Sequence, residues 1–264
     1  MRILYLGDVM GEPGIKVLER RLADLRRELS VDVVIAQLEN LSDGKGVRHA
    51  DFDRVRAAGV DFGTGGNWSL HLPESAPLLS DPAVPLIRPA NYPEGTPGLP
   101  YKYLETAQGN VLIVSLMGQI VGKDADKPVD NPLRIIDRIL EEQSSVQKAA
   151  VVVNLHGDFS SEKLVIGHYL AGRASLVVGD HWHVPTADLQ ILPGGTAHQT
   201  DVGMCGALDS CLGVRFDIIE QRWRNQQPSR NELETSGRMQ LNGVVVDVED
   251  GQAVNAQAVR EIIV

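Results

Sequence analysis

Cysteine is nearly absent from this sequence, which has only Cys205 and Cys211 among its 264 residues. A disulfide framework is therefore excluded, and a metal site built from thiolates would lack ligands. Aromatic residues are also few, at 5%, whereas hydrophobic residues make up 43% and charged residues 23%. These proportions are typical of a soluble globular protein that is large enough to bury a sizeable core.

Long apolar runs and an excess of positive charge are missing as well. No stretch approaches the roughly 18 apolar residues of a membrane-spanning helix, and the apolar run before Asp8 is too short for a signal peptide. We therefore expect a cytoplasmic protein without a membrane partner. The net charge of −10 argues against a broad basic face for duplex nucleic acid. Small anions can still bind where something local, such as a metal ion, supplies positive charge.

Short β-branched apolar runs alternate with helix-like segments along most of the chain. Helices are expected at 15–29 and 131–143, where apolar residues recur three or four positions apart. The alternation predicts βαβ units and an open, largely parallel or mixed sheet. Strands are expected at 2–6, 31–38, 60–64, 111–116, 149–155 and 174–179.

The last third of the chain has a different pattern. Segments 189–202 and 237–248 are typical of strands joined by turns, and 226–234 is a polar loop. No long linker precedes this region. We therefore interpret it as a second layer of sheet within one domain that spans residues 1–264.

Side chains able to bind metal ions lie where the apolar runs end. Taken singly, each has an ordinary explanation: Asp8 could cap a helix, and His181 and His183 could form hydrogen bonds on a surface loop. Ligands of open α/β sheets bind beyond the carboxyl ends of the strands, so repetition of the pattern predicts one two-metal site. Its expected ligands are Asp8, Glu39, Asn67, His156, His181 and His183.

The ligand atoms in this set are oxygen and nitrogen, without sulfur. Such a set favours manganese, iron or zinc ions. Two metals about 3.5–4 Å apart hold a hydroxide between them and clamp a phosphoryl group. Glu39 is the expected bridging ligand, because a glutamate directly after a buried strand needs a partner to offset its desolvation.

The sequence resembles the YmdB-like family of bacterial calcineurin-like metallophosphoesterases over essentially its whole length. The segments that carry the resemblance include GDVMGEPG (7–14), IRPANYPEGTPG (87–98) and GDHWHVPTAD (179–188). The resemblance implies a four-layer αββα sandwich with two mixed sheets. It also implies a phosphodiesterase or phosphatase that acts on cyclic nucleotides or related small phosphoesters by attack of a metal-bridging hydroxide. The implied ligands are Asp8, Glu39, Asn40, Asn67, His156, His181 and His183, of which Asn40 rests on the resemblance alone.

Two positions depart from the family pattern. The family has a histidine after the asparagine as the proton donor to the leaving oxygen, whereas this chain has Trp68. An indole N–H is not a useful acid and binds no metal; His71 is the alternative candidate for the donor. Asp180 stands where relatives commonly carry a small hydroxyl residue.

The departure at Trp68 leaves two functions open. The first is an enzyme with reduced or altered activity. The second is a catalytically weakened metal-binding sensor or regulatory protein that binds a phosphorylated ligand. A homo-oligomer is compatible with a chain of this size.

Overall fold

The computed structural model describes residues 1–121 and 125–264. Both predicted helices are present, as α1 (Gly11–Glu28) and α4 (Pro132–Glu142). The side chain of Asn131 caps α4 by accepting a hydrogen bond from the N–H of Leu133. Helix-like segments were expected between the other apolar runs without bounds, and further helices are present. In two of them, α2 and α5, the apolar residues do not gather on one face. The further helices are α2 (His49–Ala58), α3 (Ser75–Ser80), α5 (Ser160–Tyr169) and α6 (Phe216–Asn225).

The first sheet contains strands from both ends of the chain. Its order is β2-β11-β12-β1-β3-β4, and β13 also pairs with β12. Strand β1 lies between β12, which is antiparallel to it, and β3, which is parallel. The bounds are β1 Arg2–Leu6, β2 Asp8–Val9, β3 Val33–Gln37, β4 Phe62–Thr64, β11 Met204–Ala207, β12 Met239–Glu249 and β13 Gln252–Ile263.

The second sheet is formed by the middle of the chain, in the order β5-β6-β7-β8-β10-β9. The inner strands β6, β7, β8 and β10 are parallel, and the edge strands β5 and β9 run antiparallel to their neighbours. The bounds are β5 Tyr101–Thr106, β6 Gly109–Met117, β7 Ala150–His156, β8 Leu176–Asp180, β9 Gln190–Leu192 and β10 Thr196–Gln199.

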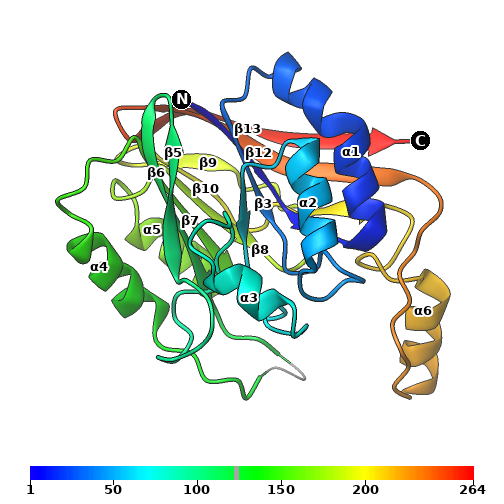
Figure 1. The fold of residues 1–264 in the computed structure, drawn as a ribbon. Helices are drawn as coiled ribbons and strands as arrows, with labels where there is room; N and C mark the ends of the chain where they lie inside the picture. The colour runs from blue at the N-terminus through cyan, green and yellow to red at the C-terminus, as the bar shows by residue number, and fades with distance from the viewer. Residues whose placement is uncertain (122–124) are drawn as a thin grey trace.

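Alternation of side chains along the strands divides the core into layers. Tyr5 of β1 packs between the sheets against apolar residues such as Val152, whereas its neighbour Leu4 packs outward with Leu18 of α1. In the second sheet Val153 packs outward with Ile136 of α4. Helices α1 and α2 therefore cover one sheet and α4 and α5 the other (Figure 1). The predicted αββα sandwich with two mixed sheets is confirmed.

One prediction about the topology was wrong. The strands of the last third do not build the second sheet: β9 and β10 join it at one edge, whereas β11, β12 and β13 complete the first sheet. The expected strand ends also come from two sheets rather than one. Backbone pairing over such separations depends on the whole chain and leaves no local signal.

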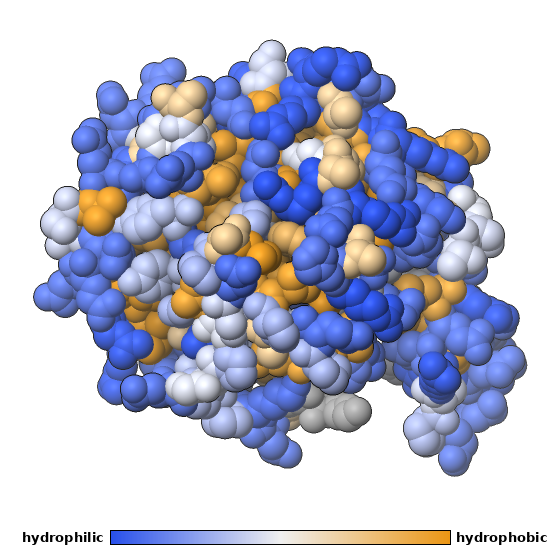
Figure 2. All heavy atoms as spheres, viewed as in Figure 1, coloured by the Kyte–Doolittle hydropathy of each residue, from blue (hydrophilic) through white to orange (hydrophobic). Residues whose placement is uncertain are grey.

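The molecular surface is largely hydrophilic in the view of Figure 2, with apolar side chains scattered among polar ones. Helix α6 projects from the body at the lower right of Figures 1 and 2. Within the residues that the structure describes, no helix is both long and apolar enough to cross a membrane.

Candidate metal centre

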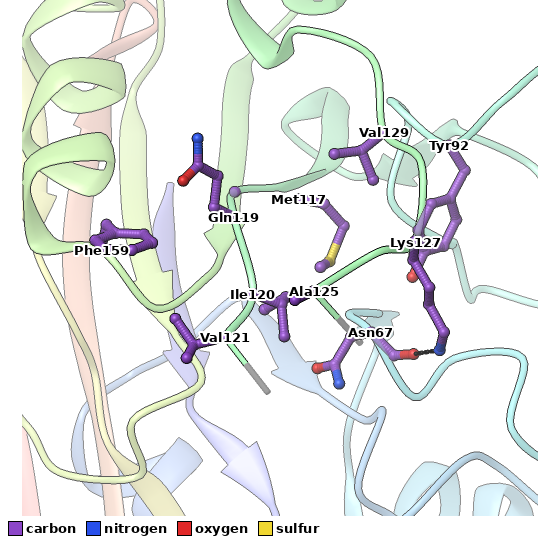
Figure 3. A pocket seen from close by; sticks show the side chains of 11 residues that line it. Asn67, Tyr92, Met117, Gln119, Ile120, Val121, Ala125, Lys127, Val129 and Phe159 are labelled. Atoms are coloured by element: carbon purple, nitrogen blue, oxygen red, sulfur yellow. Dashed lines mark hydrogen bonds between the residues drawn. The ribbon is translucent and has the colours of Figure 1, made fainter. Parts of the chain in front are cut away.

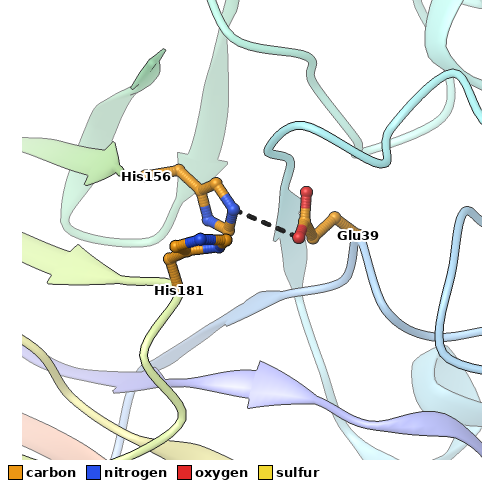
Figure 4. A group of neighbouring side chains, drawn as sticks. All are labelled: Glu39, His156 and His181. Atoms are coloured by element: carbon orange, nitrogen blue, oxygen red, sulfur yellow. Dashed lines mark ion pairs between the residues drawn. The ribbon is translucent and has the colours of Figure 1, made fainter. Parts of the chain in front are cut away.

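Polar residues at or just after the carboxyl ends of β3, β7 and β8 lie close together in the structure. His156, the last residue of β7, is completely buried. Its Nε2 lies 3.1 Å from Oε1 of Glu39 and 2.8 Å from Oδ1 of Asn67. The ring of His181 lies beside it, with the two ring centres 4.5 Å apart. Figure 4 shows His156 and His181 from one side and Glu39 from the other, all directed at a common point.

Asp180 holds the imidazole of His156 in this orientation. Its Oδ1 lies 2.7 Å from Nδ1 of His156, and its Oδ2 accepts hydrogen bonds from Tyr5, Gln37 and Asn154. Proton donation by Nδ1 leaves Nε2 as the atom that faces Glu39 and Asn67. A carboxylate behind a histidine is the usual arrangement around a metal-binding imidazole. The prediction did not include this role for Asp180, although an acid directly before two spaced histidines was a visible signal.

The charges of this buried group shift its pKa values. Burial opposes a charge on His156, but the carboxylates of Glu39 and Asp180 raise its pKa well above the usual range. Burial and the neighbouring charge of His156 lower the pKa of His181 to about 4. In the metal-free protein these shifts favour a positively charged imidazolium at His156 and a neutral imidazole at His181.

Asp8 and His183 form a second part of the group. Oδ2 of Asp8 accepts a hydrogen bond from the backbone N–H of His181 at 3.2 Å, and Oδ1 lies 3.8 Å from Nε2 of His183. Nδ1 of His183 lies 3.0 Å from the carbonyl oxygen of Leu212, to which it donates. Its Nε2 is therefore available on the side of Asp8. Burial, and next the charge of Asp180, raise the pKa of Asp8 well above its ordinary value.

Two buried oxygens support a cation at this centre. Oδ1 of Asp8 and Oδ1 of Asn40 have no hydrogen-bond partner among the described residues. Leaving buried acceptors unpaired is costly, and a bound cation would remove that cost. In addition, ligand atoms of Glu39, His156 and His181 lie within 4.8 Å of one another, as do those of Asp8, His156 and Asp180. The oxygen and nitrogen donors present thus fit a bound metal ion.

The side chain of Asn40 is oriented by the loop that follows β3. Its amide donates to the carbonyl oxygen of Gly44 at 2.9 Å, which leaves the unpaired Oδ1 as its ligand atom.

A glycine allows the chain after β4 to approach the centre. A Cβ atom at Gly66 would lie 2.4 Å from Oε2 of Glu39 and 2.6 Å from the ring of His156. No larger residue fits there without moving both side chains. The close approach places the backbone N–H of Trp68 2.8 Å from Oε2 of Glu39, to which it donates.

Trp182 anchors the loop that carries His181 and His183 through two hydrogen bonds. His181 and His183 adopt positive φ angles of 102° and 62°, which are unfavourable for residues other than glycine. The backbone N–H of Trp182 donates to Asp201 at 3.0 Å, and its indole N–H donates to the carbonyl of Asp158 at 3.0 Å.

Lys163 completes the support of this loop. Its ammonium lies 4.1 Å from the ring centre of Trp182 and 2.9 Å from Oδ2 of Asp201, in a fully buried ion pair. Sequence reasoning missed Lys163 and Asp201, because a lysine on a helix is most often exposed.

Trp68 and His71 lie together at the rim of the centre. Their rings meet edge to face with centres 5.0 Å apart, and His71 is exposed. The ammonium of Lys45 lies 4.1 Å from the centre of the Trp68 ring. A lysine ammonium therefore lies against the indole of Trp68.

An apolar cavity of about 330 Å³ lies beside Asn67. Figure 3 shows Tyr92, Met117, Val129 and Phe159 around it. The ammonium of Lys127 closes one side by donating to the backbone carbonyl of Asn67 at 3.3 Å.

Comparison with known proteins gives matches over the whole chain. A family model described as "YmdB-like protein" matches residues 4–262. A 2′,3′-cyclic-nucleotide 2′-phosphodiesterase from Bacillus subtilis is 36% identical, covering 100% of this chain and 97% of its own. A crystal structure of a hypothetical protein from Thermus thermophilus has a TM-score of 0.91 at 37% identity, with both chains fully covered.

A more distant structure, a 5′-nucleotidase precursor from the same organism, has a TM-score of 0.58 at 12% identity and shows a shared fold alone. This chain covers 100% of itself and 54% of that nucleotidase in the match. The predicted resemblance is confirmed, and the chain belongs to the YmdB-like protein family.

Proposed function

We propose that this chain is a metal-dependent phosphodiesterase that acts on cyclic nucleotides or related small phosphoesters. The observation that carries the proposal is the buried group around His156, with unpaired acceptor oxygens on Asp8 and Asn40. The enzyme class agrees with the comparisons: the chain is a metallophosphoesterase, a hydrolase of phosphoric esters. The substrate class follows the name of the Bacillus subtilis relative.

Seven side chains would hold two metal ions. Glu39 is the proposed ligand shared by the two ions, because its buried carboxylate lies at the middle of the group. One of its oxygens lies next to the imidazole of His156, and the other accepts a hydrogen bond from the N–H of Trp68. Bound metal ions would activate water and neutralise the charge of the phosphoryl group. The proposed ligands are Asp8, Glu39, Asn40, Asn67, His156, His181 and His183.

The protein itself orients this set. Asp180 fixes the ring of His156, and Trp182 fixes the loop of His181 and His183. The apolar cavity beside Asn67 would receive the organic group of the ester, since apolar walls next to a few polar groups are typical of small-ligand sites.

The proposal is tested by turnover after loading with Mn²⁺. An aryl phosphodiester and 2′,3′-cyclic AMP should both be hydrolysed, and His156→Asn should abolish both activities. His168→Asn is the matched control, because His168 is exposed on α5 and lies outside the centre. Inactivity of the wild-type protein toward both esters would overturn the proposal.

Trp68 favours a second candidate, a sensor that binds a phosphorylated ligand without turnover. The indole supplies no acid, and the neighbouring Lys45 adds positive charge that suits an anion. Calorimetry of nucleotides with the Mn²⁺-loaded protein distinguishes the two functions. Saturable binding without hydrolysis supports the sensor, and hydrolysis supports the enzyme.

A further inference from the structure

A groove of about 760 Å³ starts at Trp68, next to the proposed ligand Asn67. Its walls are the loop after β3, the segment that contains Trp68 and His71, and the α6 arm, which we define as residues 208–238 between β11 and β12. A short bridge between Val214 and Leu233 ties the arm at its base. The arm stands away from the body at the lower right of Figures 1 and 2.

The charge of this groove is opposite to that of the whole chain. Its lining contains one acid, Asp43, which pairs with one of the lining bases, Arg48, at 2.6 Å. The net charge of the chain is −10, so this local excess of positive charge is not an average property of the surface. The basic side chains in the lining are Lys45, Arg48, Arg222 and Arg230.

Arg222 keeps its charge available to a ligand. Its guanidinium donates to Ser229 and Asn231, whose acceptor atoms are uncharged. Among the described residues Arg222 forms no ion pair with a carboxylate. Arg48 and Lys45 lie on the facing wall, so positive groups line both sides.

An aromatic side chain lies at the end of the groove nearest the centre. Trp68 is half-buried, and its ring is in contact range of the Lys45 ammonium. A positively charged groove that contains an aromatic ring is the usual arrangement for binding single-stranded nucleic acid, in which phosphates meet cations and bases stack on rings. Duplex nucleic acid instead needs a broad basic face, which the overall charge opposes.

We propose that the groove holds the strand of a short single-stranded oligoribonucleotide whose terminal phosphodiester lies at the metal centre. Water adds to phosphorus, one P–O ester bond breaks, and the leaving oxygen takes the proton, which yields a phosphomonoester and a hydroxyl. The preceding phosphates of the strand lie between Arg48 and Arg222. This substrate class rests on the proposed function for its chemical step, whereas strand binding does not depend on turnover.

Fluorescence anisotropy of a fluorescein-labelled single-stranded oligoadenylate tests the groove, with a chelator present so that no hydrolysis occurs. The wild-type protein should bind the strand saturably and more weakly as salt increases. Arg222→Gln should reduce the slope of log K against log salt by about one. Arg48→Gln should reduce it by less, because Asp43 already pairs with Arg48. The double variant should bind about tenfold more weakly, or worse.

Arg224→Gln is the matched control, because Arg224 lies on the same helix and pairs with Glu220 outside the groove. Thermal unfolding checks that each variant is folded. Arg48 lies on the wall opposite the arm, so weaker binding by Arg48→Gln cannot be caused by a disturbed arm.

Several results would overturn the proposal: no saturable binding, an equal loss in Arg224→Gln, or equal affinity for the duplex. Equal competition by AMP and by the unlabelled strand would also overturn it, since the groove would then contact no additional phosphate. A protein that binds the strand but hydrolyses no ester contradicts the proposed function alone.

Discussion

Trp68 contacts the candidate centre through its backbone, and the N–H that it donates to Glu39 does not depend on the side chain. A substitution at this position can therefore introduce a proton donor while the backbone contact with Glu39 is retained. Trp68→His should accelerate hydrolysis of esters with poor leaving groups, such as 2′,3′-cyclic AMP. The gain should approach the roughly 10²–10⁴-fold that general acids contribute, and the aryl ester should gain less. Initial rates on both substrates measure this.

Trp68→Phe separates the acid from the space that the indole fills. It replaces the indole by a smaller phenyl ring without adding a proton donor, so the rate on 2′,3′-cyclic AMP should stay near that of the wild type. If the phenylalanine and histidine variants are accelerated equally, relief of crowding rather than acid catalysis explains the gain.

The pKa of His156 predicts how metal affinity depends on pH. Burial opposes its charge, but Glu39 and Asp180 raise its pKa well above the usual range, so the metal-free protein holds a proton that a metal must displace. A proton bound at the ligand competes with the metal, and the competition weakens as pH rises. The apparent Kd for Mn²⁺ should therefore fall with rising pH, by up to about tenfold per unit for each proton released.

Calorimetry of Mn²⁺ binding in buffers with different ionisation enthalpies counts the released protons. His168→Asn is again the control and should behave as the wild type. An affinity that is unchanged across the neutral range would contradict the raised pKa of His156.

At the scale of elements, the loop between β8 and β9 depends on a buried ion pair that lies beneath it. Removing Lys163 would leave Asp201 buried without its cation. We expect Lys163→Met to lower the free energy of unfolding by about 3–5 kcal/mol, the usual cost of breaking a buried pair. Urea unfolding followed by tryptophan fluorescence measures the change.

Two further variants complete this test. Lys163→Met with Asp201→Asn should be more stable than Lys163→Met alone, because the unpaired charge is removed. Arg138→Met, which breaks an exposed pair with Glu142 on α4, should change stability by less than about 1 kcal/mol. A single Lys163→Met variant as stable as the wild type would show that the pair does not hold the loop.

Strands and helices of this chain could be predicted only in part. Segment 149–155 is apolar and β-branched, and β7 is found there, ending at His156. The pattern failed for α5, where Lys163 is buried among apolar residues of a helix without a clear apolar face. Local periodicity indicates a strand or helix with one solvent-exposed polar face and one buried apolar face. The side chains of α5 are not divided in this way.

At the scale of the whole molecule, the first strand of the chain, β1, pairs with β12, the second-to-last strand. Arg2 of β1 aligns with Asp247 of β12, and their side chains form an ion pair at 2.6 Å. Because β1 lies between β12 and β3, removing either end of the chain would open the first sheet. We propose that residues 1–264 unfold as one cooperative domain.

Scanning calorimetry tests this proposal. A single transition with equal calorimetric and van't Hoff enthalpies is expected. Two separate transitions would show that the two sheets unfold independently.

The approximate ends of the strands and the chemistry of the side chains that follow them could be predicted from the sequence. Asp8, Glu39 and His156 follow apolar runs, and this local pattern depends only on side-chain type and spacing. Tertiary structure alone decided which sheet each strand joins, that Asp180 orients His156, and that Lys163 and Asp201 support the histidine loop. These relations join residues far apart in the chain, and burial and pairing at such distances arise only when the whole sandwich has packed.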